Sequence, residues 1–166
     1  MSYQTKQTIT CHTDSVEDTM QLGRQLGEFL KTYRKPLCMA LVGDLGTGKT
    51  HMSQGIARGF GVREEVTSPT FALMNTYNTA YGILYHFDVY RLDVEAELDN
   101  IGFAEFTEDT LSIVEWADKF PDALPLEVMW IRIEKTDDSS RQIVFETTEL
   151  GTDELEAIGG SYVFRN

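Results

Sequence analysis

The chain has 166 residues, 42% of them hydrophobic and 25% charged, a composition typical of one soluble globular domain, which we predict to span residues 1–166. Its 27 acidic and 14 basic residues give a net charge of −13, which repels polyphosphate backbones and argues against independent binding to RNA or DNA. Without a signal segment, an apolar run of bilayer length or a cysteine framework, the chain is expected to be cytoplasmic, with no membrane partner.

The first part of the chain predicts a short edge strand over residues 6–11 and a helix that begins at Ser15. The sequence Ser15-Val16-Glu17-Asp18 resembles a capping box with Asp at its third helical position, and apolar residues follow at helical spacing as far as Tyr33. Gly23 and Gly27 lie one turn apart, so we expect another element to approach this helix closely.

The stretch from Leu37 to Thr50 organises the rest of the chain. Six mostly apolar residues, Leu37–Val42, predict a buried strand, and Gly43–Thr50 match the phosphate-loop pattern G-x-x-x-x-G-K-[ST] at every fixed position. A helical pattern then runs to Phe60, and Gly61 is a plausible C′ glycine. Strand, loop and helix occur in the required order, which favours a phosphate-binding loop over an ordinary glycine-rich turn.

The chemistry of this loop predicts ATP and Mg²⁺ as cofactors. Glycines let backbone N–H groups approach phosphate oxygens, and the helix that follows adds the positive end of its dipole. Lys49 would place a positive charge at the β- and γ-phosphates, and Thr50 would offer its hydroxyl to Mg²⁺.

The rest of the chain is predicted to form a hairpin, a short acidic helix, a compact strand and a final antiparallel pair. In chain order these are strands over 71–77 and 82–87, a helix over 93–100 ending near Gly102, a strand over 111–114, and strands over 126–135 and 142–147. The segment beyond Gly151 carries no assignable pattern, and no internal repeat or linker is found.

Two carboxylates follow apolar strands and are candidates for holding the metal or orienting water. Asp88 closes the strand over 82–87, and Glu115 closes the strand over 111–114. A Mg²⁺ ion at Thr50 needs such a carboxylate, which in this architecture comes from the end of a neighbouring strand. The alternative for each is a strand-end carboxylate that simply faces water.

For several other residues the sequence allows both a structural and a functional role. Ser68-Pro69-Thr70 is either a nucleotide-sensing switch or an ordinary proline turn. Arg91 could stabilise phosphate charge, although a structural ion pair is favoured, and His86 is favoured as a satisfied core histidine. Trp116 is either a core anchor or a partner contact. The nine carboxylates between residues 92 and 118, a stretch without Lys or Arg, form a solvated face or, alternatively, a docking surface for a basic partner.

Four motifs together resemble the TsaE family, the bacterial ATPase subunit of the machinery that makes N6-threonylcarbamoyladenosine in tRNA. In order, they are Gly43–Thr50, Ser68–Phe71, His86–Asp88 with Tyr90–Leu92, and Glu115-Trp116, and residues 37–116 contain all of them. The departures are His51, where the family usually has a second Thr, and Thr47, where Ala is common. His51 puts in doubt a hydroxyl contact to the α-phosphate at that position.

The resemblance implies an α/β fold of the P-loop nucleotide-binding type, with three layers and a central parallel sheet flanked by antiparallel strands. It implies Thr50 and Glu115 as Mg²⁺ ligands, with Lys49, Asp88 and Glu115 as the catalytic residues. The nucleotide-binding residues would be Asp44, Leu45, Gly46, Thr47, Gly48, Lys49, Thr50 and the switch residue Thr70. The implied partners are the TsaD and TsaB subunits, and tRNA would be contacted only through their complex.

The expected function is a Mg²⁺-dependent ATPase that binds and resets the TsaB–TsaD complex in support of tRNA modification. Water would attack the γ-phosphate in line, and turnover would be slow without partners because no residue plainly supplies an arginine finger. A small-molecule kinase is one alternative, although no segment clusters arginines as a lid would. A nucleotide-binding interaction module with little hydrolysis is another, whereas a GTPase is discounted because the chain has no N-K-x-D motif.

Overall fold

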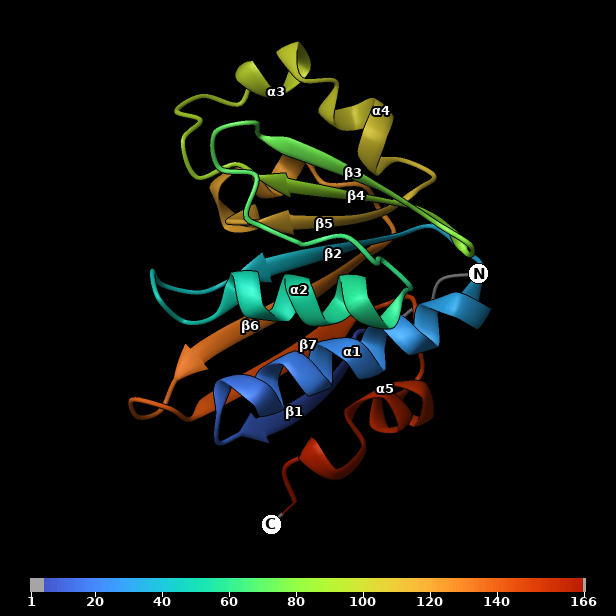
Figure 1. Cartoon of the computed structure of the whole chain (residues 1–166), viewed down its shortest axis with the longest axis vertical. Helices are drawn as coiled ribbons and strands as arrows, with labels where there is room; N and C mark the ends of the chain where they lie inside the picture. The colour runs from blue at the N-terminus through green and yellow to red at the C-terminus, as the bar shows by residue number, and fades with distance from the viewer. Residues whose placement is uncertain (1–4, 166) are drawn as a thin grey trace.

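The computed structural model of the chain describes residues 5–165, which build one seven-stranded sheet with helices against it (Figure 1). In chain order the elements are β1 (Gln7–Thr13), α1 (Val16–Tyr33), β2 (Leu37–Val42), α2 (Lys49–Gly59), β3 (Met74–Thr79), β4 (Gly82–Asp88), α3 (Glu97–Asn100), α4 (Phe103–Thr107), β5 (Leu111–Glu115), the 3₁₀ turns η1 (Ala117–Lys119) and η2 (Pro121–Ala123), β6 (Val128–Lys135), β7 (Arg141–Thr147), α5 (Thr152–Gly159) and η3 (Gly160–Tyr162).

The sheet confirms the predicted fold class. Its strand order is β1-β7-β6-β2-β5-β4-β3. The four central strands β6, β2, β5 and β4 run parallel, whereas β3 pairs antiparallel at one edge and β7 and β1 do so at the other. β1 lies at the edge as predicted. The carboxyl ends of the parallel strands therefore share one side of the molecule, where an α/β sheet places its ligands.

Strand β2 shows why the sheet is covered on both faces. All six of its residues are buried, and successive side chains point to opposite faces. Leu37, Met39 and Leu41 join the core that contains α1, α2 and α5, whereas Cys38 and Ala40 join a second core with side chains of α3, α4 and the 3₁₀ turns. A continuous apolar run is typical of a parallel strand buried on both sides, and the result is the predicted three-layer arrangement.

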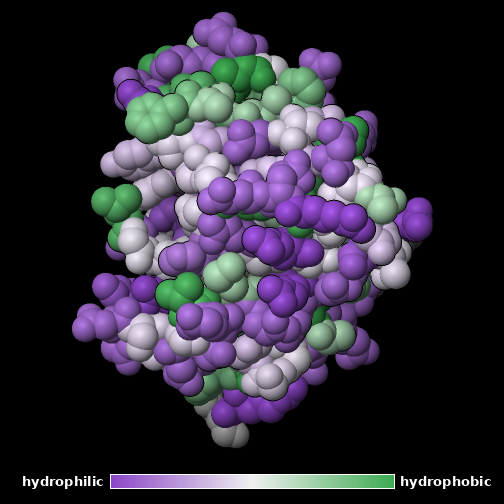
Figure 2. All heavy atoms as spheres, viewed as in Figure 1, coloured by the Kyte–Doolittle hydropathy of each residue, from purple (hydrophilic) through white to green (hydrophobic). Residues whose placement is uncertain are grey.

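Helices α1 and α2 pack through glycines, as predicted from Gly23 and Gly27. A Cβ atom at Gly23 would lie 2.7 Å from the Met52 carbonyl oxygen, and one at Gly27 would overlap the Ile56 carbonyl. On α2, Gly59 faces the α1 backbone equally closely. The outward faces of the two helices are largely hydrophilic, with hydrophobic side chains mostly scattered (Figure 2). None of the helices described in residues 5–165 is long and apolar enough to cross a bilayer.

Ser15 caps the start of α1 as predicted, but the predicted capping box does not form. The Ser15 hydroxyl oxygen accepts the Asp18 amide at 3.0 Å, as expected. The Asp18 carboxylate, however, accepts the amide of Asp14 rather than that of Ser15. The Asp18 carboxylate thus bonds one residue further upstream than the Glu of a capping box would.

Two predicted starts are wrong by three residues or more, and the sequence did not predict helices α4 and α5. Residues 71–73 form a turn before β3, because Leu73 adopts a left-handed conformation (φ 69°) and its carbonyl accepts the Asp88 amide. The acidic helix begins only at Glu97, and Gly102 (φ 68°) separates it from α4, which the sequence did not predict. Beyond Gly151 the chain forms α5, which packs against β1 and α1.

Candidate functional site

The phosphate-loop pattern lies where the sequence places it, between the end of β2 and the start of α2. Gly46 and Gly48 adopt positive φ values of 80° and 105°, which other residues rarely adopt. Thr47 closes the loop on itself, since its hydroxyl donates to the Asp44 carbonyl at 2.9 Å. The loop therefore has the bend that turns backbone N–H groups toward an anion at a helix N-terminus.

The side chain of Lys49 folds back over its own loop. Its Nζ donates to the carbonyl oxygens of Gly43 at 2.5 Å and Asp44 at 2.8 Å, and it lies 3.9 Å from the centroid of the Trp116 ring. Burial lowers the pKa of Lys49, while nearby carboxylates, Glu115 first among them, oppose that shift. Lys49 is thus a buried cation, 5% exposed, held by carbonyl dipoles and an aromatic face.

The Glu115 carboxylate is buried, 2% exposed, at the end of β5. One oxygen, Oε1, accepts the Thr50 hydroxyl at 3.1 Å. The other, Oε2, accepts the Ser53 hydroxyl at 3.0 Å and lies 2.6 Å from Nε2 of His86. The β4–β5 register pairs Asp88 with Glu115, so the two predicted acids lie side by side. The structure therefore brings Thr50, Glu115 and Asp88 together, as predicted.

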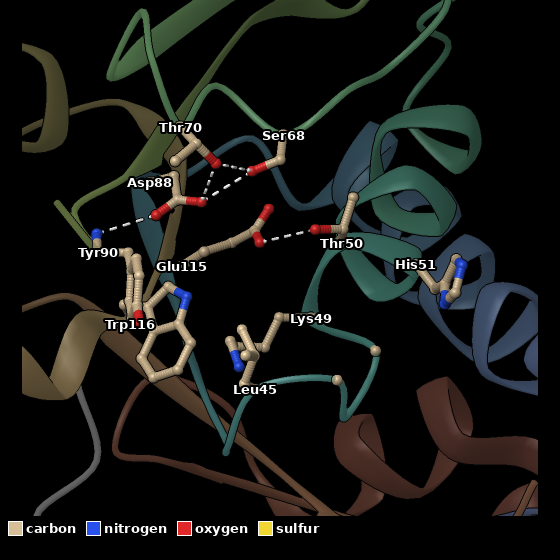
Figure 3. Close-up of a pocket in the computed structure, with 12 residues that line it drawn as sticks. Leu45, Lys49, Thr50, His51, Ser68, Thr70, Asp88, Tyr90, Glu115 and Trp116 are labelled. Atoms are coloured by element: carbon tan, nitrogen blue, oxygen red, sulfur yellow. Dashed lines mark hydrogen bonds between the residues drawn. The ribbon is translucent and has the colours of Figure 1, made fainter.

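The predicted switch residues are tied to Asp88. Its Oδ2 accepts the hydroxyls of Ser68 at 2.8 Å and Thr70 at 3.0 Å, and its Oδ1 accepts the Tyr90 amide at 2.9 Å (Figure 3). Asp88 is only 4% exposed, so these three donors satisfy most of its bonding capacity. The segment before β3 is therefore bonded directly to an acid that borders the pocket.

These side chains border a pocket of about 450 Å³. It is lined by Leu45, Gly46, Gly48, Lys49, Thr50, His51, Ser68, Thr70, Asp88, Tyr90, Glu115 and Trp116. In Figure 3, Glu115 and Thr50 point toward one another across it, whereas His51 points away from them. Two of the predicted nucleotide-binding residues, Asp44 and Thr47, border a neighbouring hollow instead and contribute to the loop through the bonds described above.

The donor set fits Mg²⁺. The Thr50 and Glu115 oxygens are 3.1 Å apart, and adjacent oxygens around an octahedral ion with Mg–O bonds of 2.0–2.1 Å are about 2.9 Å apart. Among residues 5–165 there is no cluster of three or more His, Cys, Asp or Glu that could enclose a metal without other ligands.

Three contacts at the site were not predicted from the sequence. His86 is in the core as expected, yet it is not fully satisfied: its Nε2 meets Glu115, and its Nδ1 has no partner among the described residues. Ser53 bonds the same acid one helical turn after Lys49. Arg141, at the start of β7, donates from Nε to the Thr47 carbonyl at 2.7 Å.

The interpretations left open for Arg91 and Trp116 can now be compared with the structure. Arg91 makes no ion pair with any residue from 5 to 165, so the favoured interpretation is wrong; its guanidinium lies 4.6 Å from the centroid of the Phe71 ring. Trp116 is half-buried with a left-handed backbone (φ 64°), and its ring lies 4.6 Å from that of Tyr90. It therefore borders the pocket beside Lys49 and also packs against the second core.

The sequence is similar to those of known proteins. A family model described as threonylcarbamoyl adenosine biosynthesis protein TsaE matches residues 13–143. Two similar proteins are both named tRNA threonylcarbamoyladenosine biosynthesis protein TsaE. The one from Haemophilus influenzae is 33% identical over 83% of this chain and 89% of its own length. The one from Bacillus subtilis is 41% identical over 64% of this chain and 67% of its own length.

The fold is also similar to a solved structure. The crystal structure of YdiB from Bacillus subtilis superposes with a TM-score of 0.70 and 29% sequence identity, covering 93% of both chains. The matched family region contains the phosphate loop, the Ser68–Thr70 segment, Asp88 and Glu115, which are the parts that converge on the pocket. With a family model over residues 13–143 and relatives at this level of identity, the chain belongs to the TsaE family.

Proposed function

We propose that this chain is a Mg²⁺-dependent ATPase that supports the formation of threonylcarbamoyladenosine in tRNA. The observation that carries the proposal is the convergence of a phosphate loop, the Thr50 hydroxyl and the Glu115 carboxylate on one pocket. The family names supply the biosynthetic process. The bent loop and the paired oxygens support a nucleoside triphosphate with its metal as the ligand.

The loop amides and Lys49 would hold the phosphates, and Thr50 and Glu115 would hold the Mg²⁺. When bound, the ion neutralises charge on the phosphate oxygens and fixes their orientation. Lys49 must leave the carbonyls of Gly43 and Asp44 to reach a phosphate, and the negative charge it then meets favours its protonated form.

Asp88 is our candidate for orienting the attacking water. Both of its oxygens accept protein donors: Oδ2 accepts from Ser68 and Thr70, and Oδ1 accepts from Tyr90. It can act on water only if the Ser68–Thr70 segment gives up part of this bonding. Hydrolysis would therefore depend on a rearrangement of that segment, which accounts for the slow turnover expected of the chain alone.

We further propose that ATP binding and hydrolysis reset the TsaB–TsaD complex between rounds of modification. A chain that couples hydrolysis to a partner needs an element that responds to nucleotide and reaches the surface. The Ser68–Thr70 segment fits this description, because it bonds Asp88 inside the pocket and continues into Phe71, which is 87% exposed. In this proposal the threonylcarbamoyl transfer itself takes place on TsaD.

The proposal predicts that Glu115→Ala lowers Mg²⁺-dependent ATP hydrolysis at least tenfold, because the ion loses its carboxylate ligand. Phosphate release would be measured for wild type, Glu115→Ala, the more conservative Glu115→Gln, and Glu105→Ala as an exposed acid outside the pocket. Circular dichroism would confirm that each variant is folded. Turnover by Glu115→Ala and Glu115→Gln equal to that of Glu105→Ala would overturn the metal assignment.

The biosynthetic role is tested by reconstitution. TsaB, TsaD, tRNA, threonylcarbamoyl-adenylate and ATP would be combined with and without this protein, and modified tRNA counted per TsaD over several rounds. We expect multiple rounds only when the wild-type chain is present, and a single round with the Glu115→Ala chain. Equal numbers of rounds in all three mixtures would contradict the proposal.

A further inference from the structure

We propose that His86 is a positioning residue that leaves Glu115 a single free oxygen, so that the site selects a small octahedral cation such as Mg²⁺ over Ca²⁺. This inference rests on the proposed function, since it takes Glu115 as the metal ligand. It goes further by assigning a role to a buried histidine that borders neither the phosphate loop nor the pocket.

The two oxygens of Glu115 are bonded unequally. Oε2 lies 2.6 Å from Nε2 of His86, and it shares the single hydrogen of the Ser53 hydroxyl, 3.0 Å away, with the Lys49 carbonyl oxygen at 3.1 Å from that hydroxyl. Oε1 has one partner, the hydroxyl of Thr50, which is itself a candidate ligand. His86 and Ser53 are both fully buried, at 0% exposure. Two inner donors therefore occupy one oxygen, while the other is directed to the pocket.

The proton on His86 can be placed from these bonds. A carboxylate oxygen only accepts, so Nε2 carries the hydrogen of the 2.6 Å bond. Nδ1 is buried and meets no partner among residues 5–165, so nothing there competes for the orientation of the ring. The interaction with Glu115 is thus the only polar contact that the described structure gives the imidazole. It holds Oε2, the carboxylate oxygen that does not contact Thr50.

The strands hold the pair in place. His86 on β4 is paired in register with Ile113 on β5, and Glu115 follows two residues later on the same face of that strand. Both residues lie in the central parallel part of the sheet, and the Tyr77 ring lies 6.3 Å from that of His86. Because neighbouring strands fix both backbones, Glu115 cannot rotate its second oxygen into the pocket without losing the bond to His86.

Cation preference follows from the number of free oxygens. Ca²⁺ takes six to eight oxygens and often binds a carboxylate through both, whereas Mg²⁺ requires a tight octahedron, keeps several waters and accepts one oxygen per carboxylate. A Glu115 with Oε2 occupied offers one oxygen and therefore suits Mg²⁺. Removing the His86 donor releases Oε2 from its shortest bond, which allows two-oxygen binding and favours Ca²⁺.

The test compares His86→Leu, which removes the donor, with His86→Gln, whose side-chain amide can still donate to Oε2. Calorimetry would give the Kd of Mg²⁺ and of Ca²⁺ for each protein saturated with ADP, with ADP alone as the reference. We expect His86→Leu to lower the ratio of the Ca²⁺ Kd to the Mg²⁺ Kd about tenfold or more, in the range typical of groups that orient metal ligands. His86→Gln should stay near the wild-type ratio.

Each outcome bears on a different claim. A folded His86→Leu protein with the wild-type ratio would overturn the inference while leaving the metal assignment in place. If wild type and Glu115→Gln both bind cations no more tightly than free ADP does, the proposed function fails instead. Should His86→Leu fail to fold by circular dichroism, Ser53→Ala tests the same oxygen, and an unchanged ratio there would count against the inference.

Discussion

Lys49 is central to the proposed site, but its burial lowers the stability of the folded chain at neutral pH. Burial lowers its pKa from the ordinary value of 10.5, and the opposing charges of Glu115, Asp118 and Asp88 do not fully offset that effect. Between the lowered pKa and 10.5, the unfolded chain binds more protons at this residue than the folded chain does. The free energy of unfolding therefore gains a contribution from Lys49 that rises with pH in that range.

Nucleotide affinity should have the opposite pH dependence. Phosphate charges favour the protonated amine and raise its pKa, so binding takes up a proton wherever the pH exceeds the pKa of Lys49 in the free protein. We predict that the Kd for Mg²⁺-ADP begins to rise below pH 10.5 and then rises by up to about tenfold per pH unit. Calorimetry from pH 7.5 up to about 10.5 measures this, and a Kd that stays constant up to pH 10.5 would contradict it.

Only part of the site could be predicted at the scale of residues. Lys49 and Thr50 follow from a contiguous motif, because one tight turn fixes their positions. The bond from His86 to Glu115 joins residues 29 positions apart, and the bond from Arg141 to Thr47 spans 94. Such contacts depend on strand order and register, which no local pattern specifies, and an isolated His or Arg carries no signal of its partner.

At the scale of elements, the β6–β7 hairpin supports the phosphate loop. Arg141, at the start of β7, donates from Nε to the Thr47 carbonyl and from Nη1 to the carbonyls of Asp137 at 3.1 Å and Ser140 at 2.9 Å. A single guanidinium thus joins the hairpin turn to the loop between β2 and α2. The planar fork of Arg makes these bonds together, which the ammonium of Lys cannot do with the same geometry.

We predict that Arg141→Ala leaves the protein folded but loosens the phosphate loop. The expected results are a Kd for Mg²⁺-ADP several-fold weaker and a free energy of unfolding lower by about 1–2 kcal/mol, the range for partly exposed bonds to a charged group. Hydrogen exchange of residues 43–48 should become faster. Arg141→Lys should restore only part of the loss, and Arg63→Ala, an exposed arginine elsewhere, should have no effect. Unchanged exchange in Arg141→Ala would show that the loop holds its shape alone.

Elements with a clear local sequence pattern were predicted correctly, and elements without one were missed. Strand β2, helix α2 and the β3–β4 hairpin are marked by an apolar run, a helical period and turn residues. The error at residues 71–73 arose because apolar residues extended the strand pattern into a turn set by a bond between Leu73 and Asp88. Helices α3 and α4, of four and five residues, are too short to display a period.

On the scale of the whole molecule, charge governs which partners the chain can meet directly. The net charge is −13. Of the nine carboxylates between residues 92 and 118, all but Glu97 and Glu115 are exposed, which fits either a solvated face or a docking surface for a basic partner. Glu115 alone is buried, and it faces the pocket. The exposed acidic surface and the proposed metal ligand are therefore separate features of the same segment.

This charge distribution predicts that the chain alone does not retain tRNA. Binding to a phosphate backbone depends on clustered cations that release counterions, and a protein with almost twice as many acidic as basic residues opposes that process. Filter binding at 50 and 150 mM KCl, with and without Mg²⁺-ATP, should show no saturable retention by this chain at micromolar concentrations. Adding TsaB and TsaD should place all components in one complex during gel filtration. Salt-sensitive, submicromolar binding of tRNA by the chain alone would instead mean that local basic groups outweigh the net charge, and would contradict access to tRNA only through the complex.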